Sequence, residues 1–142
     1  TPHPLNKYFY KIGGVNFQNI KKCWIGLFCF IDNKNAEQIY IEENVCISFK
    51  VTIVSHFDPK YAIKNHPIKN KKNKIIIKKN VFIGSNTTIL PNVTLKKGTF
   101  VMAGSVVCRN SNEYDIIQGN PAKKIGSLLR FKKYKKQKEF FN

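Results

Sequence analysis

Acidic residues and arginine are scarce in this chain. Its 142 residues include 25 Lys and Arg against 8 Asp and Glu, and the only arginines are Arg109 and Arg130. Specific nucleic-acid recognition usually relies on arginine, and no nucleic-acid-binding motif is present, so we expect no nucleic-acid partner. The net charge of +17 can arise in two ways. One is the Lys, Asn and Ile enrichment of an AT-biased coding sequence; the second is attraction to a polyanion.

Long apolar runs and cysteine pairs are also missing. The longest apolar run, residues 23–31, falls short of the roughly 20 residues that span a bilayer, and no signal peptide is visible. The four cysteines form no CxxC motif and no paired metal spacing: Cys23, Cys29, Cys46 and Cys108. This usage favours reduced thiols. We therefore expect one cytoplasmic domain, residues 1–142, with no metal site.

A repeat of six residues dominates the second half of the chain. Branched aliphatic residues recur at Ile77, Ile83, Ile89, Leu95, Val101 and Val107. Three residues after each stands Asn or Gly: Asn80, Asn86, Asn92, Gly98, Gly104 and Asn110. A period of six fits neither a helix nor a flat strand, and is typical of repeats that wind into a β-helix. We expect the aliphatic residues to point inward and the Asn and Gly residues to form corners with φ > 0.

The same phase appears earlier in the chain. Its aliphatic members are Ile41, Ile47 and Ile53, and Asn44 is a further expected corner. An earlier pair six residues apart is formed by Ile25 and Ile31. The position four residues after an aliphatic residue is mostly small or β-branched, which suits a narrow interior: Cys29, Val45, Val51, Val81, Thr87, Val93, Thr99 and Ser105. The pattern therefore predicts an all-β protein whose coils occupy residues 25–110.

Three other segments flank or interrupt the predicted coils. Residues 1–24 form an irregular or helical lead-in. Residues 54–74 are polar and rich in Lys and Asn, and we expect a loop extruded from the coils. Residues 111–142 contain a turn at Gly119-Asn120-Pro121, then a short helix from Lys123 that caps the last coil, then a basic tail. The tail is either a solvated face or a contact with a membrane surface or another polyanion.

Residues 80–95, 101–107 and 119–123 resemble the hexapeptide-repeat acyltransferases, in particular the galactoside/maltose and polysaccharide O-acetyltransferase type. The three segments occur in the order and spacing of that family, and the resemblance covers about residues 25–130. It implies a left-handed parallel β-helix, an exception to the usual right-handed crossover. It also implies a homotrimer that uses acetyl-CoA, with active sites at the subunit boundaries.

The resemblance points to His56 as the catalytic base. Acyl transfer to an alcohol or amine needs a group that accepts a proton near neutral pH, a role suited to histidine. Of His3, His56 and His66, His56 stands where the predicted loop leaves the coils, the position of the family's catalytic histidine. Many relatives have a second histidine two residues later. This chain has Asp58 there, so Asp58 either orients His56 or belongs to a turn.

The resemblance also implies residues for the acyl donor. Ser85 matches a position near the thioester and is a candidate oxyanion donor, unless it merely fills the coil. Ala103 matches a backbone contact to the pantetheine arm, with the same alternative of coil filling. Cys108 and Arg109 match a Thr-Lys pair of the family, and Lys123 matches a basic residue near the nucleotide phosphates. Arg109 and Lys123 could instead be solvated surface charges.

For the acceptor, Asp32 matches a polar family position that faces the carbohydrate, although it could equally belong to a loop turn. The predicted function is acetyl-CoA-dependent O-acetylation of a sugar or polysaccharide hydroxyl, by direct transfer with His56 as base. Two alternatives stay open: N-acetylation of an amino sugar, and a non-catalytic β-helix that binds polyanions. A γ-class carbonic anhydrase needs three zinc-binding histidines and is disfavoured, because the three histidines include no closely spaced pair.

Overall fold

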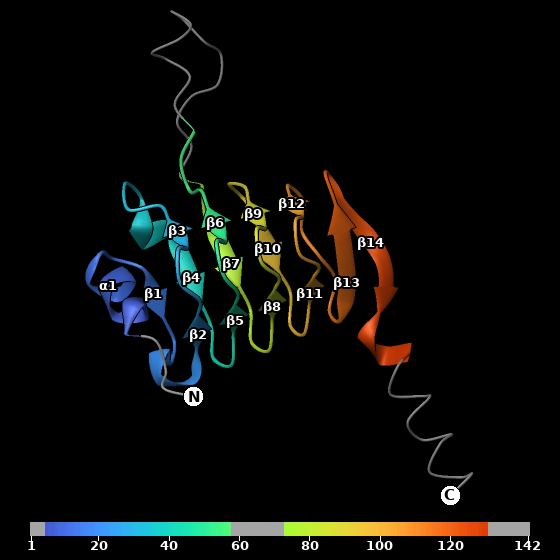
Figure 1. Ribbon diagram of the computed structural model, residues 1–142, viewed down its shortest axis with the longest axis horizontal. Helices are drawn as coiled ribbons and strands as arrows, with labels where there is room; N and C mark the ends of the chain where they lie inside the picture. Colours follow the sequence, from blue (N-terminus) through green and yellow to red (C-terminus); the bar gives the residue numbers. More distant parts are fainter. Residues whose placement is uncertain (1–4, 58–72, 131–142) are drawn as a thin grey trace, which may run out of the picture.

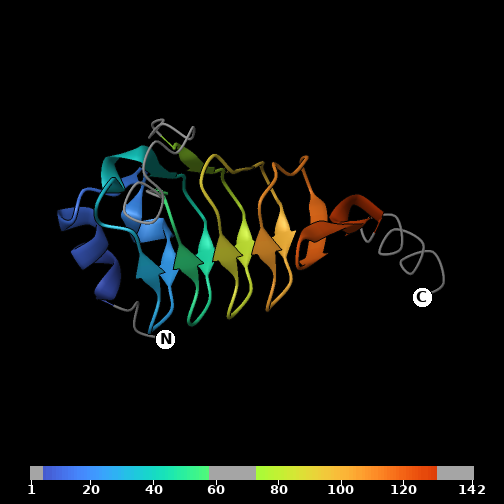
Figure 2. The same ribbon diagram turned by 90° about the horizontal axis from the view of Figure 1, so that it is seen from above.

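The computed structural model describes residues 5–57 and 73–130. Within these ranges, short strands wind into coils that stack along one axis (Figure 1). Helix α1 lies at the N-terminal end of the stack, and a β-hairpin lies at the other end (Figure 2). None of the helices in this described part is long and apolar enough to cross a membrane.

The strands form three sheets, and consecutive strands of the coils belong to different sheets. Sheet A contains β1 (Asn16–Phe17), β4 (Ile39–Ile41), β7 (Ile75–Ile77) and β10 (Thr94–Leu95). Sheet B contains β2 (Trp24–Ile25), β5 (Cys46–Ile47), β8 (Phe82–Ile83), β11 (Phe100–Val101), β13 (Asp115–Gly119) and β14 (Ala122–Ser127). Sheet C contains β3 (Phe30–Ile31), β6 (Thr52–Ile53), β9 (Thr88–Ile89) and β12 (Val106–Val107). Apart from β14, neighbouring strands within each sheet are parallel.

This topology is a parallel β-helix with three strands per coil, as the six-residue repeat predicts. Phe82 pairs with Phe100 one coil later, so an uninterrupted coil is three hexads long. The predicted inward aliphatic residues are all 0–5% exposed: Ile25, Ile31, Ile41, Ile47, Ile53, Ile77, Ile83, Ile89, Leu95, Val101 and Val107. Each such burial stabilises the fold by about 1.5–3 kcal/mol relative to an exposed side chain. The core is therefore a set of aliphatic columns running along the axis.

Most of the predicted corners adopt the left-handed conformation. Asn44, Asn80, Asn86 and Asn92 have φ between 57° and 65°, and the corner glycines have φ of 69° and 72°. The prediction for Asn110 is wrong, because its φ is not positive. Its side-chain Oδ1 instead accepts a hydrogen bond from the Thr94 N–H at 2.7 Å. Phe28 and Lys50 have φ of 60° and 55°, and the sequence did not identify them because neither residue type favours this region.

The coils extend further toward the N-terminus than the repeat predicts, and the lead-in includes a helix. Strand β1 pairs with β4 although it precedes residue 25. Between β1 and β2 lies a 3-10 helix, η1 (Ile20–Lys22). Helix α1 (Asn6–Ile12) covers the first coil: Asn6 Nδ2 donates to Gly26 O at 2.8 Å, and the buried Lys7 Nζ donates to Cys23 O at 2.9 Å.

The C-terminal cap differs from the prediction. The helix expected from Lys123 is wrong over residues 123–127, which belong to β14 and pair antiparallel with β13. The turn at residues 119–121 reverses the chain, so β14 covers the backbone groups of β13 that would otherwise form an open sheet edge. Residues 128–130 are helical, and the basic tail after them lies outside the described residues.

The predicted loop coincides with a gap between strands. Strand pairing stops at Ile53 and resumes at Ile75. Residues 54–57 and 73–74 are in no strand, and the segment between them, with Asp58 and His66, lies outside the described residues. The preceding coil also has an insertion, the 3-10 helix η2 (Ala36–Gln38). The course of the loop and the left-handed winding stay predictions.

Candidate functional site

Three corners join the sheets, and each predicted site residue lies at or beside one of them. The B–C corner contains residues 26–29, 48–51, 84–87 and 102–105. The C–A corner contains residues 32–38, 54–57, 73–74, 90–93 and 108–111. The A–B corner contains residues 42–45, 78–81 and 96–99.

His56 lies at the C–A corner beside Asp32. Strand β3 pairs with β6 so that Ile31 stacks on Ile53, and the turns that follow these strands therefore meet. His56 Nδ1 contacts Asp32 Oδ2. The His56 side chain is 35% exposed, whereas that of Asp32 is 1% exposed. A buried carboxylate thus holds an imidazole ring that is open to solvent on another side.

A set of hydrogen bonds keeps Asp32 ionised. Burial alone would raise the pKa of Asp32, but its hydrogen bonds outweigh burial and hold the pKa below the ordinary value. Besides His56, the donors are the Lys34 N–H to Oδ1 at 3.0 Å, and the Ser55 N–H and hydroxyl to Oδ2 at 2.9 and 3.0 Å. An ionised Asp32 accepts the Nδ1–H of His56, which leaves a lone pair on Nε2. This is the arrangement of an oriented general base.

The predicted contact of Asp32 with the acceptor stays a prediction, and the burial of Asp32 does not favour it. A residue that faces an acceptor must be accessible, whereas Asp32 is buried and satisfied by the backbone, Ser55 and His56. Asp32 makes a contact with His56 of the kind that the sequence offered for Asp58, which lies outside the described residues. Sequence reasoning also missed Ser55. Ile31 stacks on Ile53 although their separation in the sequence is no multiple of six, because η2 lengthens this coil, so the repeat did not reveal the stacking.

Ser85 and Ala103 lie on adjacent coils of the B–C corner. The Gly104 N–H donates to Ser85 O at 2.8 Å, and the Ser85 hydroxyl is 2.7 Å from that of Ser48. A Cβ on Gly84 would lie 2.5 Å from Ala103 N, so only glycine permits this close approach of the coils. Ala103 is exposed, and its backbone is accessible along this corner.

The remaining predicted donor-binding residues divide between two corners. Lys123 is exposed on β14 near the end of the hairpin, where the Gly119 N–H donates to Ser105 Oγ at 3.2 Å. Lys123 therefore continues the B–C column of Ser85 and Ala103. Cys108 and Arg109 are exposed at the C–A corner. They lie two coils from His56, since β12 stacks on β9 and β9 on β6, a separation of about 10 Å. Within the chain, sheet C therefore lies between Ser85, Ala103 and Lys123 on one side and Cys108 and Arg109 on the other.

The thiols show no features of a nucleophile. All four cysteines are free, and burial raises the pKa of Cys23, Cys29 and Cys46. A raised pKa lowers the fraction of reactive thiolate. Among residues 5–57 and 73–130, no group of three or more His, Cys, Asp or Glu side chains could hold a metal ion.

The fold and the corner site define a β-helix protein of the hexapeptide-repeat class. Residues 74–109 match the family model described as bacterial transferase hexapeptide (six repeats). YvoF of Bacillus subtilis (strain 168), which carries the name of an acetyltransferase, is 35% identical over 105 residues, 74% of this chain and 57% of YvoF. Protein CapG of Staphylococcus aureus is 41% identical over 91 residues, 63% of this chain and 53% of CapG. The chain thus spans about half the length of these relatives.

Solved structures give the same fold. A mutant of AntD, an N-acyltransferase from Bacillus cereus in complex with dTDP and coenzyme A, has a TM-score of 0.65 at 25% identity, over 84% of this chain and 66% of that one. A hexapeptide-repeat acetyltransferase from Vibrio cholerae in complex with acetyl coenzyme A has a TM-score of 0.59 at 23% identity, over 80% and 64%. The chain belongs to the hexapeptide-repeat acyltransferase family.

Proposed function

We propose that this protein is an acetyl-CoA-dependent O-acetyltransferase that acts on a sugar or polysaccharide hydroxyl. The observation that carries the proposal is the contact between buried Asp32 and half-exposed His56 at the C–A corner. The names of two structural neighbours support the donor and the acceptor. The Vibrio cholerae enzyme is complexed with acetyl coenzyme A. A protein from Clostridium difficile is a maltose O-acetyltransferase, and its structure has a TM-score of 0.53 at 22% identity, over 80% of this chain and 63% of that one.

The chain's own residues account for the proton transfer. Asp32 holds the Nδ1–H of His56, so Nε2 accepts the proton of the attacking hydroxyl. Acetyl-CoA supplies the acetyl thioester that this hydroxyl attacks. The Ser85 hydroxyl donates a hydrogen bond to the carbonyl oxygen as that oxygen gains negative charge. The proton on Nε2 then passes to the departing thiolate, and no cysteine of the chain carries the acetyl group.

The division of the residues between two corners supports a homotrimer with shared sites. Ser85, Ala103 and Lys123 follow the B–C corner, whereas His56 and Arg109 follow the C–A corner. A left-handed β-helix trimer in which the C–A corner of one copy faces the B–C corner of the next would bring both groups onto one acyl donor. The exposed Lys123 and Arg109 would then face its phosphates.

The test is thiol release from acetyl-CoA against sugars, nucleotide sugars and acidic glycans, with the wild type, His56→Ala and Phe57→Ala. Phe57 is the exposed neighbour of His56 and serves as the matched control. We expect acceptor-dependent release that falls about 10²–10⁴-fold in His56→Ala and stays near wild type in Phe57→Ala. Full activity of His56→Ala would overturn the role of the histidine.

N-acetylation of an amino sugar is the second candidate, favoured by the similarity to the AntD N-acyltransferase. Glucosamine and its N-acetylated form distinguish the two reactions, because only the former offers a free amine. Release with glucosamine alone would favour N-acetylation. Absence of release with every acceptor, together with no acetyl-CoA binding by calorimetry, would leave a polyanion-binding β-helix as the function.

A further inference from the structure

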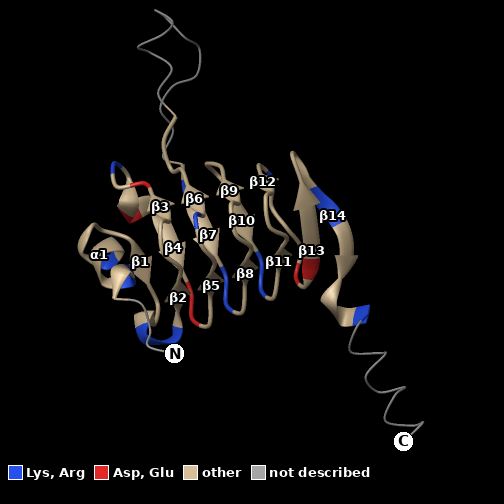
Figure 3. Ribbon diagram, viewed as in Figure 1, with Lys and Arg blue, Asp and Glu red and all other residues tan. Residues whose placement is uncertain are grey.

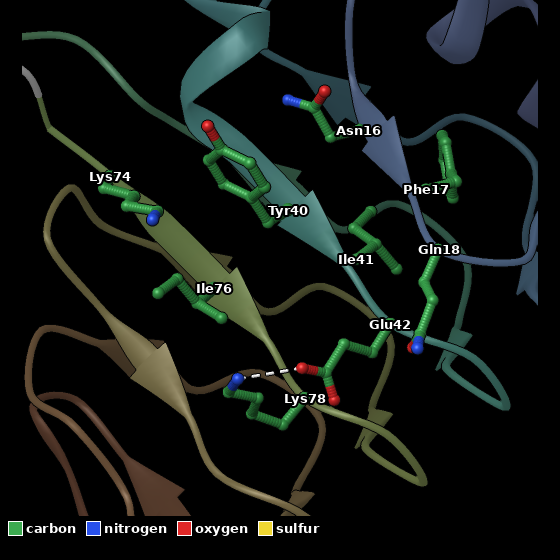
Figure 4. Close-up of a pocket in the computed structure, with 9 residues that line it drawn as sticks. All are labelled: Asn16, Phe17, Gln18, Tyr40, Ile41, Glu42, Lys74, Ile76 and Lys78. Atoms are coloured by element: carbon green, nitrogen blue, oxygen red, sulfur yellow. Dashed lines mark hydrogen bonds and ion pairs between the residues drawn. The ribbon is translucent and has the colours of Figure 1, made fainter.

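The outer face of sheet A carries a hollow that the proposed chemistry does not use. Its volume is about 380 Å³, and its lining comes from β1, β4 and β7 and the residues beside them (Figure 4). Tyr40 and Ile76 form its floor, Lys74 lies at the C–A side, and Glu42 and Lys78 lie at the A–B side. Pockets of this size hold small molecules or single units of a polymer.

The lining of the hollow carries two lysines, Lys74 and Lys78, and one carboxylate, Glu42, which gives it a net charge of +1. Lys78 Nζ donates to Glu42 Oε1 at 2.8 Å, and the Lys79 backbone N–H donates to the other carboxylate oxygen at 2.9 Å. Glu42, the only acidic residue of the lining, is therefore neutralised. The ammonium group of Lys74 lies over the Tyr40 ring, 4.4 Å from its centroid, which holds the one positive charge of the lining that Glu42 does not offset.

At the A–B corner, the turn after β4 carries Glu42 and Glu43, and the turns of the next two coils carry lysine pairs. Lys78 and Lys79 stand one coil before Lys96 and Lys97 at this corner, and the two turns form adjacent blue segments in Figure 3. Because Glu43 pairs with Lys22 and Glu42 with Lys78, the lysines of the following coils leave this corner with a net positive charge.

The Lys74 side of the hollow belongs to the corner that also holds His56. Lys74 immediately precedes β7, and His56 follows β6, so both belong to the C–A corner. In Figure 1 the described residues at the two ends of the loop meet the coils at the same edge of the stack. A chain molecule that leaves the hollow past Lys74 enters this corner.

We propose that the hollow binds an acidic sugar unit of the acceptor, next to the unit that is acetylated. The anionic group, a carboxylate or a phosphate, accepts a charge-assisted hydrogen bond from Lys74, whose charge Glu42 does not offset. Ile76 provides apolar surface for the sugar ring, and Tyr40 contributes by holding the Lys74 ammonium group in place. This inference rests on the proposed function for the role of His56, but binding in the hollow is measurable without acetyl transfer.

The experiment is calorimetric titration of the protein without acetyl-CoA. The probes are hyaluronan tetrasaccharide, which carries carboxylates, UDP-glucose, which carries phosphates, and neutral maltotetraose. The variants are Lys74→Gln, Tyr40→Ala and the control Lys50→Gln, which removes one charge at the distant B–C corner. We expect one charged probe to bind at least tenfold more tightly than maltotetraose, with a further tenfold loss in Lys74→Gln and in Tyr40→Ala.

The pattern of outcomes identifies the anion and separates the two proposals. Preference for hyaluronan assigns a carboxylate, and preference for UDP-glucose assigns a phosphate. Equal losses in Lys74→Gln and Lys50→Gln, or no binding of either charged probe to the wild type, would overturn the hollow as a subsite. If binding depends on Lys74 but thiol release never occurs, the subsite stands and the acetyltransferase proposal fails. If thiol release occurs and the KM for the acceptor is unchanged in Lys74→Gln, the acetyltransferase proposal stands and the subsite fails.

Discussion

His56 Nδ1 contacts Asp32 Oδ2, although 24 residues separate them in the sequence. The contact arises because β3 stacks directly on β6, which brings the turns after these strands together. One partner is buried and the other is partly open to solvent. Such a pairing fixes the tautomer and direction of an imidazole that still reaches a substrate.

Replacing Asp32 by Asn tests the positioning role. The amide removes the negative charge that stabilises a protonated imidazole, so we expect kcat to fall about 10²–10³-fold, with the KM for acetyl-CoA within about twofold of wild type. Steady-state thiol release measures both constants. Ser55→Ala keeps the carboxylate and should cost much less. Wild-type kcat in Asp32→Asn would contradict the proposed role.

The lowered pKa of Asp32 predicts a pH dependence of stability. Since the folded-state pKa lies below the ordinary value of 3.8, the ionised form stabilises the fold above about pH 4. That contribution is lost as the pH falls through the lower folded-state pKa. The free energy of unfolding of Asp32→Asn should therefore fall less steeply than that of the wild type below about pH 4. Urea titrations at a series of pH values measure this, and parallel curves would exclude it.

Lys50 occupies a left-handed corner that favours a different residue. Its φ is 55°, a conformation that costs most residues roughly 1–2 kcal/mol and costs Asn less. Lys50→Asn should therefore raise the free energy of unfolding by about 0.5–1 kcal/mol. Lys96→Asn is the control, since Lys96 is also exposed but its φ is not positive. An equal change in both variants would show that loss of charge, not backbone strain, is responsible.

Gly84 permits the closest approach between coils at the B–C corner. An added Cβ would lie 2.5 Å from Ala103 N and 2.8 Å from its Cα, and both are backbone atoms that cannot rotate away. We expect Gly84→Ala to lower the free energy of unfolding by about 2–3 kcal/mol. At Gly126 the nearest atom to an added Cβ is Ile116 Cδ1 at 3.6 Å, so Gly126→Ala should have little effect. Chemical denaturation of both variants checks the difference.

The repeat predicts much of the fold because its causes are local. Ile47, Ile83 and Val101 point inward because each stands at the same phase of a hexad, and a hexad supplies one side of the coil. Asn80 and Asn86 form corners because their own side chains tolerate positive φ. The same locality explains the failures. Phe28 and Lys50 are held at corners by their neighbours rather than by their residue type.

The candidate site is less predictable, because its geometry depends on which turns stack. His56 was predicted from a motif, but its partner was not, since the pairing with Asp32 requires β3 and β6 to meet across a coil lengthened by η2. The hollow on sheet A likewise joins Tyr40 to Lys74 from successive coils. No periodicity within one coil encodes such contacts.

The hexad phase, the inward aliphatic columns and most of the corners follow from the sequence alone. Burial and backbone preference act within a few residues, so a local pattern is enough to predict them. Only the tertiary structure decided the pairing of Asp32 with His56, the antiparallel cap of β14 on β13, and the charged hollow on sheet A. Each of these depends on how separate coils, or the two strands of the hairpin, come into register. Insertions and turns of irregular length set that register, and because they do not follow the six-residue repeat, the repeat cannot predict it.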